Sequence, residues 1–244
     1  MSSLSSILGP LDSQVTPSRE PLLPGNNIVY AVVGKKGSGK STLILSLLKS
    51  KLAFKHRFNH IWMFSPTAQG DSKYEKLVEE LTDLDQYFDT CTEDVLSGVL
   101  SRITLLNERW KRDAKKKEIR HLLILDDCMC DLSPSKAATL SRMVITSRHL
   151  HCSILIATQK YNAIPTLIRA QLDLISCFKS YNTREITTLQ EDISIDPSAF
   201  YEIYEYCTEG PHSFMHVNLL TNPVTFYRRF DELEIDASVL SRRK

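Results

Sequence analysis

Residues 34–41 read GKKGSGKS, a glycine-rich loop that ends in lysine and serine. The loop follows an apolar run at 28–33, typical of a buried strand, and precedes a leucine-rich stretch at 42–48, typical of a helix. Strand, glycine-rich loop and helix in this order bind nucleotide phosphates, because backbone N–H groups and the helix N-terminus both face the anion. A solvated surface turn does not require this order. The chain is therefore predicted to bind a nucleoside triphosphate.

Each position in the loop has an expected role. Gly34 allows a sharp turn, and Gly39 lets the backbone close around the α- and β-phosphates. Lys40 is expected to reach the β- and γ-phosphates, and Ser41 to offer its hydroxyl to Mg²⁺. The expected cofactors are therefore ATP and Mg²⁺. The predicted nucleotide contacts are Gly34, Lys35, Lys36, Gly37, Ser38, Gly39, Lys40, Ser41 and Thr42.

A second apolar run, at 121–125, has the length of a buried strand and ends in two aspartates. P-loop proteins that hydrolyse nucleotides hold Mg²⁺ through its water shell with a carboxylate at the end of such a strand. Asp126 is therefore predicted to bind the metal together with Ser41. Asp127 is predicted to polarise the attacking water, a role in which the longer glutamate is more usual. A lone aspartate here would indicate only a polar strand end, whereas adjacent acids in a chain with this loop favour catalysis.

A third apolar run, at 152–158, ends in the uncharged residue Gln159. If this strand lies between the loop strand and the acid strand, Gln159 faces the γ-phosphate. There it could orient water and report hydrolysis to the rest of the protein. Taken alone, the pattern equally indicates a simple strand end, but the loop and the paired acids favour the sensor role.

Composition limits the class of protein. A chain of 244 residues with 42% hydrophobic residues can form one domain with a sizeable core. Its net charge of +1 does not indicate a protein that binds nucleic acid over its whole surface. Seven basic residues lie between 109 and 120, whereas residues 71–94 are acidic. The basic run indicates either contact with DNA phosphates or a solvated helix face, and neither interpretation is preferred.

The six cysteines are scattered and form no CxxC pair, so zinc is not expected and a reducing compartment fits. No apolar stretch approaches the roughly 20 residues of a membrane helix, and no signal-peptide pattern begins the chain. We therefore expect a soluble, intracellular protein without a membrane partner.

Strand and helix patterns alternate from residue 28 onward, which predicts an α/β fold with a central, mainly parallel sheet. Residues 1–27 are rich in serine and proline and are expected to form a flexible arm with a docking segment at Leu22–Leu23. Residues 28–230 are expected to form a single P-loop ATPase domain, followed by a polar tail at 231–244. The other predicted elements are strands at 60–64 and 172–178, helices near 73–82, 93–116, 133–150, 184–190 and 197–206, and a hairpin at 213–227.

These segments together resemble the genome-packaging ATPases of poxviruses, other large DNA viruses and virophages, which belong to the FtsK–HerA group of P-loop motors. The resemblance rests on the loop, on Leu122–Asp127, on Ser147-Arg148-His149 and on the strand that ends in Thr158-Gln159. It covers about residues 28–180. The resemblance implies a RecA-like P-loop core with helices on both faces of the sheet and the Gln159 strand between the other two.

The same resemblance implies an Mg-dependent ATPase that moves double-stranded viral DNA into a preformed capsid. It implies a homo-oligomeric ring, a pentamer or hexamer, that docks at the capsid or portal vertex in the host-cell cytoplasm or viral factory. It also implies an arginine that enters the neighbouring subunit's site. Arg148 is the first candidate, and the alternatives are Arg142, Arg169 and Arg184. Candidates for pore-lining cations are Lys136, Lys160 and the run at 109–120.

Three other functions remain open from the sequence. A nucleotide or small-molecule kinase would use the same loop, but no arginine-rich lid is evident. A protein that binds ATP only to assemble would not need the catalytic groups. A helicase or plasmid-transfer translocase of the same group is hardly separable by sequence, and the absence of an attached accessory domain favours packaging.

Overall fold

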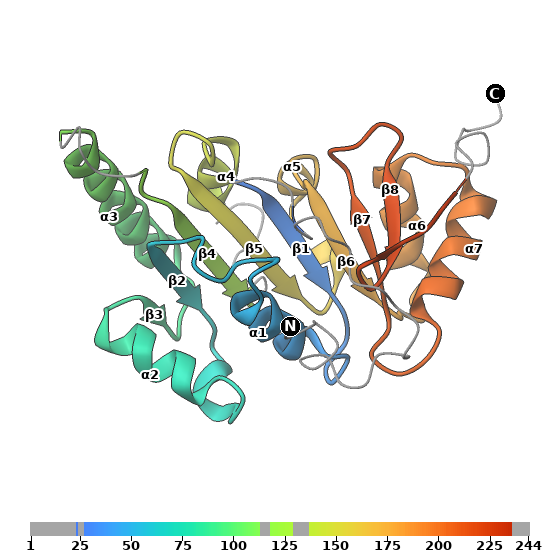
Figure 1. Cartoon of the computed structure of the whole chain (residues 1–244), viewed down its shortest axis with the longest axis horizontal. Coiled ribbons are helices and arrows are strands. Elements are labelled where there is room, and N and C mark those ends of the chain that lie inside the picture. The colour runs from blue at the N-terminus through green and yellow to red at the C-terminus, as the bar shows by residue number, and fades with distance from the viewer. Residues whose placement is uncertain (1–22, 24–26, 113–117, 129–136, 236–244) are drawn as a thin grey trace.

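The structure, a computed structural model, describes residues 23, 27–112, 118–128 and 137–235. These residues form one sheet of nine strands with helices on both faces (Figure 1). The strands are β1 (Val29–Val33), β2 (His60–Phe64), β3 (Tyr87–Phe88), β4 (His121–Asp126), β5 (Cys152–Thr158), β6 (Leu174–Phe178), β7 (Phe214–Asn218), β8 (Thr225–Arg228) and β9 (Asp231–Glu232). The α-helices are α1 (Lys40–Lys49), α2 (Glu75–Asp83), α3 (Glu93–Lys111), α4 (Ala138–Ile145), α5 (Thr166–Arg169), α6 (Thr183–Ile193) and α7 (Pro197–Thr208).

The strand order is β3-β2-β4-β5-β1-β6-β7-β8-β9, parallel from β3 to β6 and antiparallel from β6 to β9. The predicted mainly parallel α/β sheet is therefore confirmed. Every residue of β1, β4, β5 and β6 is buried, as expected for parallel strands covered on both faces. Strand β5 lies between β4 and β1, so the prediction for the position of the strand preceding Gln159 is also correct.

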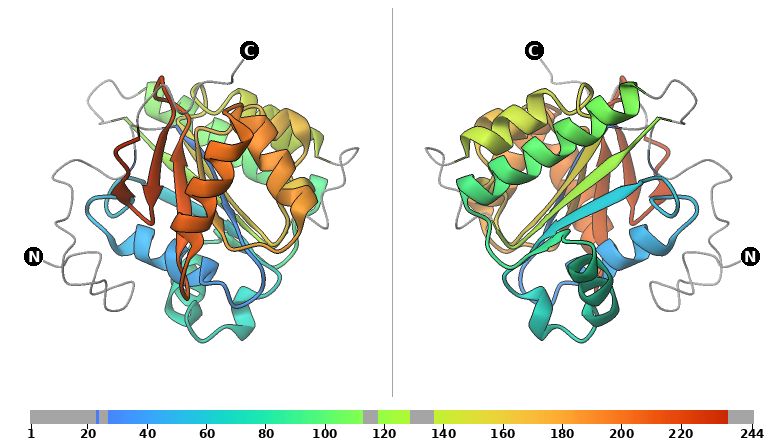
Figure 2. Two further views of the ribbon diagram at one scale, coloured as in Figure 1. Left: turned by 90° about the vertical axis from the view of Figure 1, so that its right-hand side faces the viewer. Right: turned by 90° about the vertical axis from the view of Figure 1, so that its left-hand side faces the viewer.

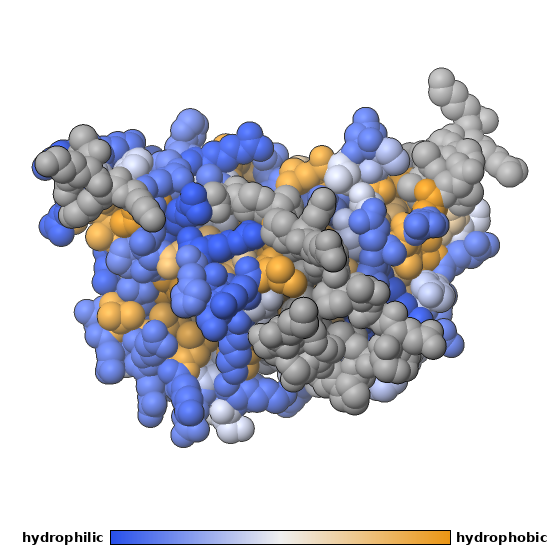
Figure 3. Space-filling view, in the orientation of Figure 1, coloured by the Kyte–Doolittle hydropathy of each residue, from blue (hydrophilic) through white to orange (hydrophobic). Residues whose placement is uncertain are grey.

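Helices cover both faces of the sheet (Figure 2). Two hydrophobic clusters lie between the helices and the strands, one on each face. On one face, α1 and α2 pack against the strands through residues such as Ile44 and Leu81. On the other face, α3 to α7 contribute residues such as Ile103 and Phe200. Leu23, in the predicted docking segment, is fully buried in the first cluster. The face seen in Figure 3 is mainly hydrophilic, with separate small hydrophobic areas. No helix in the described residues is long and apolar enough to span a membrane.

Several predicted elements differ from the structure. Helix α4 ends at Ile145 rather than near residue 150, because the chain must turn to enter β5, where Cys152 N donates to Ser147 O at 3.0 Å. The predicted start of this helix, at Ser133-Pro134, lies outside the described residues. The first two residues of the predicted polar tail form β9, which pairs with β8. The sequence did not predict β3, whose two residues extend the sheet beyond β2.

His216 in β7 is a buried histidine whose effect on the stability of the fold depends on pH. It is buried on the sheet and hydrogen-bonded to Ser176 Oγ at 3.0 Å, and burial lowers its pKa to about 3. The unfolded chain binds this proton near pH 6.5, so His216 destabilises the fold as the pH falls from about 6.5 towards 3. Between pH 7 and pH 5 this single group should lower the free energy of unfolding by about 2 kcal/mol.

Urea unfolding of the wild type and of His216→Gln at these two pH values measures this effect. The variant should lose about 2 kcal/mol less than the wild type between pH 7 and pH 5. His56→Asn replaces an exposed histidine with positive φ, which asparagine tolerates, and should keep the wild-type dependence. Equal pH dependence in all three proteins would show that His216 is protonated in the folded state.

Candidate functional site

The carboxyl ends of β4, β5 and β1 meet at one edge of the sheet, which we call the carboxyl edge. The loop at 34–39 leaves β1 there, and Gly34 N donates to Thr158 O of β5 at 3.0 Å. A cavity of about 1000 Å³ opens over the loop and the first turn of α1. Helix α1 has no acidic residue in its first turn, so nothing there opposes an anion bound at its N-terminus.

Two glycines are required by the shape of the loop. A Cβ atom at Gly34 would lie 2.5 Å from Ser38 Oγ and 2.9 Å from Phe178 Cβ, which is too close for any side chain. Gly39 has φ +116°, a backbone conformation that other residues rarely adopt. Glycine is therefore required at both positions, at Gly34 because there is no room for a side chain and at Gly39 because of its backbone conformation.

Asp127 contacts two of the other predicted catalytic residues, Lys40 and Gln159. Its backbone has φ 54°, which turns the chain sharply after β4 and directs the carboxylate into the cavity. Asp127 Oδ1 lies 3.9 Å from Lys40 Nζ, and Oδ2 accepts a hydrogen bond of 3.3 Å from Gln159 Nε2. Lys40 Nζ also donates to Gly34 O at 2.8 Å. A lysine, a carboxylate and an amide thus lie together at the loop, with Asp127 between the other two.

Asp126 lies deeper, at 3% exposure, where it can face a cation but not bulk water. Burial, and next the charge of Asp127, raise the pKa of Asp126 to about 6. The buried Tyr74 hydroxyl lies close enough to Ser41 and Asp126 to interact with both, but it makes no hydrogen bond of ordinary geometry with any described residue. A carboxylate that is costly to bury and an unsatisfied hydroxyl beside Ser41 fit a site for Mg²⁺.

The cavity has two unlike walls. One is formed by residues 66–73, after β2, on the side of the acids. The other comes from the far side of β1 and includes Phe178 at the end of β6, His212, Phe214 in β7 and Arg229 after β8. His212 Nδ1 donates to Ser38 O at 3.0 Å and so ties the second wall to the loop.

The structure brings most of the predicted site residues together. The cavity is lined by Lys36, Gly37, Gly39, Lys40, Ser41, Thr42, Asp127 and Gln159. Gly34 and Lys35 instead line a smaller adjacent cavity of about 170 Å³, which Gln159 also borders. Lys35 there lies over the Tyr181 ring, 5.1 Å from its centroid.

Arg148 does not join this site. It is exposed in the turn before β5. Burial raises the pKa of Asp173, which precedes β6, and the positive charge of Arg148 partly opposes that rise. Both residues lie at the opposite edge of the sheet, the amino edge, one strand length or about 17–20 Å from the loop. Arg169 is held within its own subunit by Asp192 at 3.4 Å and by the Tyr161 ring.

Neither Tyr74 nor the second wall was predicted from the sequence. The segment around Tyr74 indicates only an acidic helix, and no residue next to it in the sequence indicates that its side chain lies near Ser41. His212 and Arg229 come from the C-terminal hairpin, about 175–190 residues from the loop in sequence, and only the strand order brings them near. The cluster Gly210-Pro211-His212 indicated a turn but not its destination.

Tyr74→Phe tests the role of the buried hydroxyl. Groups that orient metal ligands typically contribute 10–100-fold to affinity, so the half-saturating Mg²⁺ concentration for binding of a fluorescent ATP analogue should rise at least about 10-fold. Stability should change little, because the hydroxyl has no hydrogen bond to lose. Tyr87→Phe, which removes a hydrogen bond of 2.7 Å to Ser65 O outside the cavity, is the matched control. An unchanged Mg²⁺ requirement in Tyr74→Phe would exclude the role.

The order of the strands, together with the glycine-rich loop before α1, is that of a P-loop NTPase fold. Residues 18–200 match the family described as poxvirus A32 protein, and the chain belongs to this family. A DNA packaging protein of monkeypox virus, OPG160, is 30% identical over 153 residues, 62% of this chain and 46% of that protein. Uncharacterized protein 015R of frog virus 3 (isolate Goorha) is 26% identical over 180 residues, 73% of this chain and 52% of that protein. The chain thus spans about half the length of these curated relatives.

Among solved structures, the fold is similar to that of the genome packaging NTPase B204 from Sulfolobus turreted icosahedral virus 2 in complex with ATP-gammaS. The TM-score is 0.60 at 19% identity, over 83% of this chain and 98% of B204. The conjugation coupling protein TcpA of pCW3 has a TM-score of 0.52 at 16% identity, over 84% of this chain and 61% of TcpA. At these identities the likeness establishes the fold alone.

Proposed function

We propose that this chain is an Mg-dependent ATPase that moves double-stranded viral DNA into a preformed capsid. The observation that carries the proposal is Asp127, which contacts both Lys40 and Gln159 at the phosphate-binding loop. This arrangement suits hydrolysis by an activated water rather than binding alone. Membership in the poxvirus A32 family, which has a relative named as a DNA packaging protein, supports the coupling to DNA.

In this proposal the chain's own residues divide the work of hydrolysis. The loop and the N-terminus of α1 bind the phosphates. Lys40 exchanges its hydrogen bond to Gly34 O for contacts with the β- and γ-phosphates. Ser41 and Asp126 would hold Mg²⁺, which would neutralise charge on the phosphate oxygens. Asp127 accepts a proton from the attacking water, and Gln159 orients that water through the bond it shares with Asp127.

The position of the acids also orients the nucleotide. Asp126, Asp127 and Gln159 end strands on the β4–β5 side of β1, so the γ-phosphate points to that side. The base then extends over β6 and β7, towards the wall that contains Phe178, His212 and Arg229. An aromatic ring and a guanidinium group suit contacts with a base and a ribose.

Arg148 is proposed to act on a neighbouring subunit, because it lies too far from its own loop to act there. A ring, pentameric or hexameric, would bring the amino-edge turn of one subunit to the site of the next. Arg184, exposed at the start of α6 beside the smaller cavity, is the alternative. Arg142 is also exposed, whereas Arg169 is already held by Asp192.

Arg148→Ala should lower ATP hydrolysis by the assembled protein by about 10³-fold, within the range known for arginines supplied by a partner. Binding of a fluorescent ATP analogue to dilute protein should not change. Lys76→Ala removes an exposed cation of α2 that is not among the candidate arginines, and it serves as the control. If dilute Arg148→Ala loses ATP affinity as strongly as it loses turnover, the role in a neighbouring site is wrong.

The function itself is tested by ATP hydrolysis with and without double-stranded DNA. Faster ATP hydrolysis in the presence of DNA, whatever the DNA sequence, supports a motor, because contacts with phosphates do not depend on sequence. Transfer of phosphate to added nucleoside monophosphates would support a kinase instead. Hydrolysis that DNA does not change, or no hydrolysis, would favour an assembly protein. Docking of the protein at the capsid or portal vertex remains part of the proposal, to be tested with capsid components.

A further inference from the structure

Charge is unevenly distributed along the first part of the chain. Residues 21–70 contain seven lysines and arginines and no aspartate or glutamate. Three of the seven belong to the phosphate-binding loop, and the other four follow at Lys49, Lys51, Lys55 and Arg57. The next segment, 71–94, contains nine acids. In a chain of net charge +1, this separation makes the segment 21–70 locally basic, and a polyanion is attracted to such a segment.

The four later cations lie away from the nucleotide. Helix α1 starts at the phosphate-binding loop and runs back along the sheet, so the turn at 50–57 that follows it lies at the amino edge, where β2 begins. Arg120, just before β4, lies at the same edge. Asn59 joins the two segments, since Asn59 N donates to Arg120 O at 2.8 Å and Arg120 N donates to Asn59 Oδ1 at 2.9 Å. This surface is therefore separate from the ATP site.

Arg57 has no acidic partner in the part of the chain that the structure describes. Among the described residues its hydrogen bonds are two long contacts, each 3.5 Å, with Leu23 O, and no carboxylate lies within ion-pair distance. Partial burial, and next the charge of Arg120, lower the pKa of Arg57. Two guanidinium groups that repel each other at a protein surface are stabilised when an anion binds between them. Lys51 and Lys55 are exposed on the same turn.

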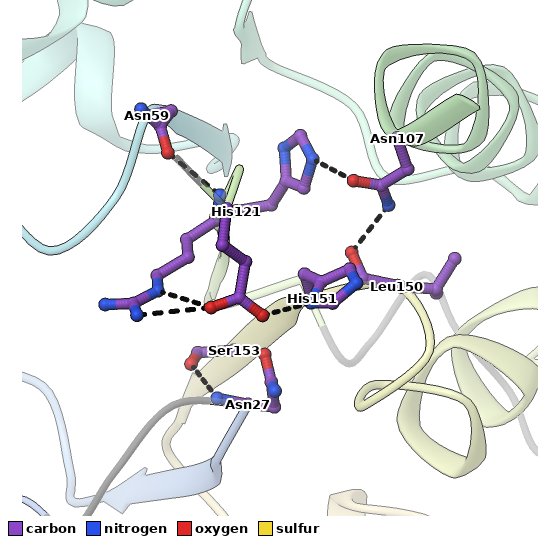
Figure 4. Close-up of polar contacts among 9 residues, drawn as sticks. Asn27, Asn59, Asn107, His121, Leu150, His151 and Ser153 are labelled. Carbon is purple, nitrogen blue, oxygen red and sulfur yellow. Dashed lines mark hydrogen bonds and ion pairs between the residues drawn. The ribbon is translucent and has the colours of Figure 1, made fainter. Parts of the chain in front are cut away.

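The amino edge is held in place by hydrogen bonds from several elements (Figure 4). Glu118 accepts from Arg120 Nη2 at 3.2 Å and pairs with His151 Nδ1 at 2.8 Å. Asn107 of α3 bonds to His121 Nε2 at 3.3 Å and donates to Leu150 O at 2.8 Å. Because these bonds fix Arg120 before any ligand binds, binding there costs less conformational entropy than it would at a free side chain.

We propose that Lys51, Lys55, Arg57 and Arg120 form a surface that binds the phosphate backbone of duplex DNA. The proposal rests on the proposed function and adds where the DNA is held, at the edge of the sheet opposite the nucleotide. Contacts of this kind are made to phosphates, so binding is independent of sequence and weakens steeply with salt. Structural changes caused by hydrolysis at the carboxyl edge would then reach the DNA through the β-strands of the sheet, because the nucleotide and the DNA do not touch.

The experiment measures the dissociation constant for a 30-base-pair duplex of random sequence, at several salt concentrations, by fluorescence anisotropy. Two variants of the full chain are compared with the wild type: Lys51→Gln/Lys55→Gln, and the same pair with Arg57→Gln. Loss of each phosphate contact lowers the slope of log K against log[salt] by about 0.9. The double variant should therefore lose about 2 from the slope and bind at least about 10-fold more weakly at low salt.

The control variant is Lys76→Gln, which removes an exposed lysine of α2, away from this surface. It should bind the duplex as the wild type does. Lys51 and Lys55 are exposed, and their side chains make no hydrogen bond or ion pair with another described residue, so loss of folding does not explain an effect of the double variant. Binding of a fluorescent ATP analogue, unchanged in all variants, checks this point.

Each outcome bears on a different claim. If the wild type does not bind duplex DNA under any salt condition, the proposed function itself fails. If the wild type binds and the double variant binds equally well, or if the control variant alone weakens binding, this surface is not the DNA contact. If the wild type binds vesicles containing phosphatidylserine through these lysines but not DNA, the surface recognises anionic lipid and the proposal is overturned.

Discussion

Asp127→Asn is expected to lower kcat for ATP hydrolysis by about 10²–10⁴-fold and to leave ATP binding close to that of the wild type. Asparagine has the same size and tolerates the positive φ of this position, so the turn after β4 should persist. Its amide oxygen can still accept the hydrogen bond from Gln159, but it cannot accept a proton from water. Phosphate release and binding of a fluorescent ATP analogue, measured on the same preparation, separate these effects.

Asp83→Asn, at the exposed end of α2, is the matched control and should keep wild-type turnover. If Asp127→Asn hydrolysed ATP at the wild-type rate, another group would have to act on the water. Asp126 is a poor substitute in that role, since its carboxylate is buried beside the Tyr74 hydroxyl.

Lys40→Ala is expected to weaken ATP binding by about 10²–10⁴-fold, because hydrogen bonds to charged groups contribute about 1.5–3 kcal/mol each and Lys40 is predicted to make two. The side chain is 7% exposed and already points along the loop to Gly34 O at 2.8 Å, so it needs little rearrangement to reach a phosphate. Direct titration with a fluorescent ATP analogue measures the loss.

Lys49→Ala removes an exposed lysine from the last turn of the same helix and should leave binding unchanged. An affinity for ATP within about threefold of the wild type in Lys40→Ala would mean that the triphosphate binds elsewhere, because a loss below about 0.7 kcal/mol is smaller than one such hydrogen bond.

The sequence predicted the parts of the site that lie at strand ends. Buried parallel strands are short apolar runs, and the residue that ends each run must lie at the carboxyl edge. For this reason Asp126, Asp127 and Gln159 could be assigned to one edge without a structure. Their actual proximity depends on β5 lying between β4 and β1, which the resemblance to packaging ATPases supplied and the strand order confirmed.

Other parts of the site could not be predicted, because they depend on contacts between distant segments. The Tyr74 hydroxyl reaches Ser41 only because the loop after β2 folds over α1. His212 and Arg229 reach the cavity only because the sheet continues beyond β6 with antiparallel strands. The end of α4 was placed too late because residues 146–150 have no strong helix-ending residue, and the turn is imposed by the pairing of β5.

The most direct test of the central claim is a crystal structure of the protein with Mg²⁺ and ATPγS. We expect the triphosphate in the loop at 34–41, Ser41 and Asp126 on the metal side, and Asp127 and Gln159 facing the γ-phosphate. A structure in which the nucleotide occupies the loop while Asp126 and Gln159 point away from it would contradict the proposed mechanism.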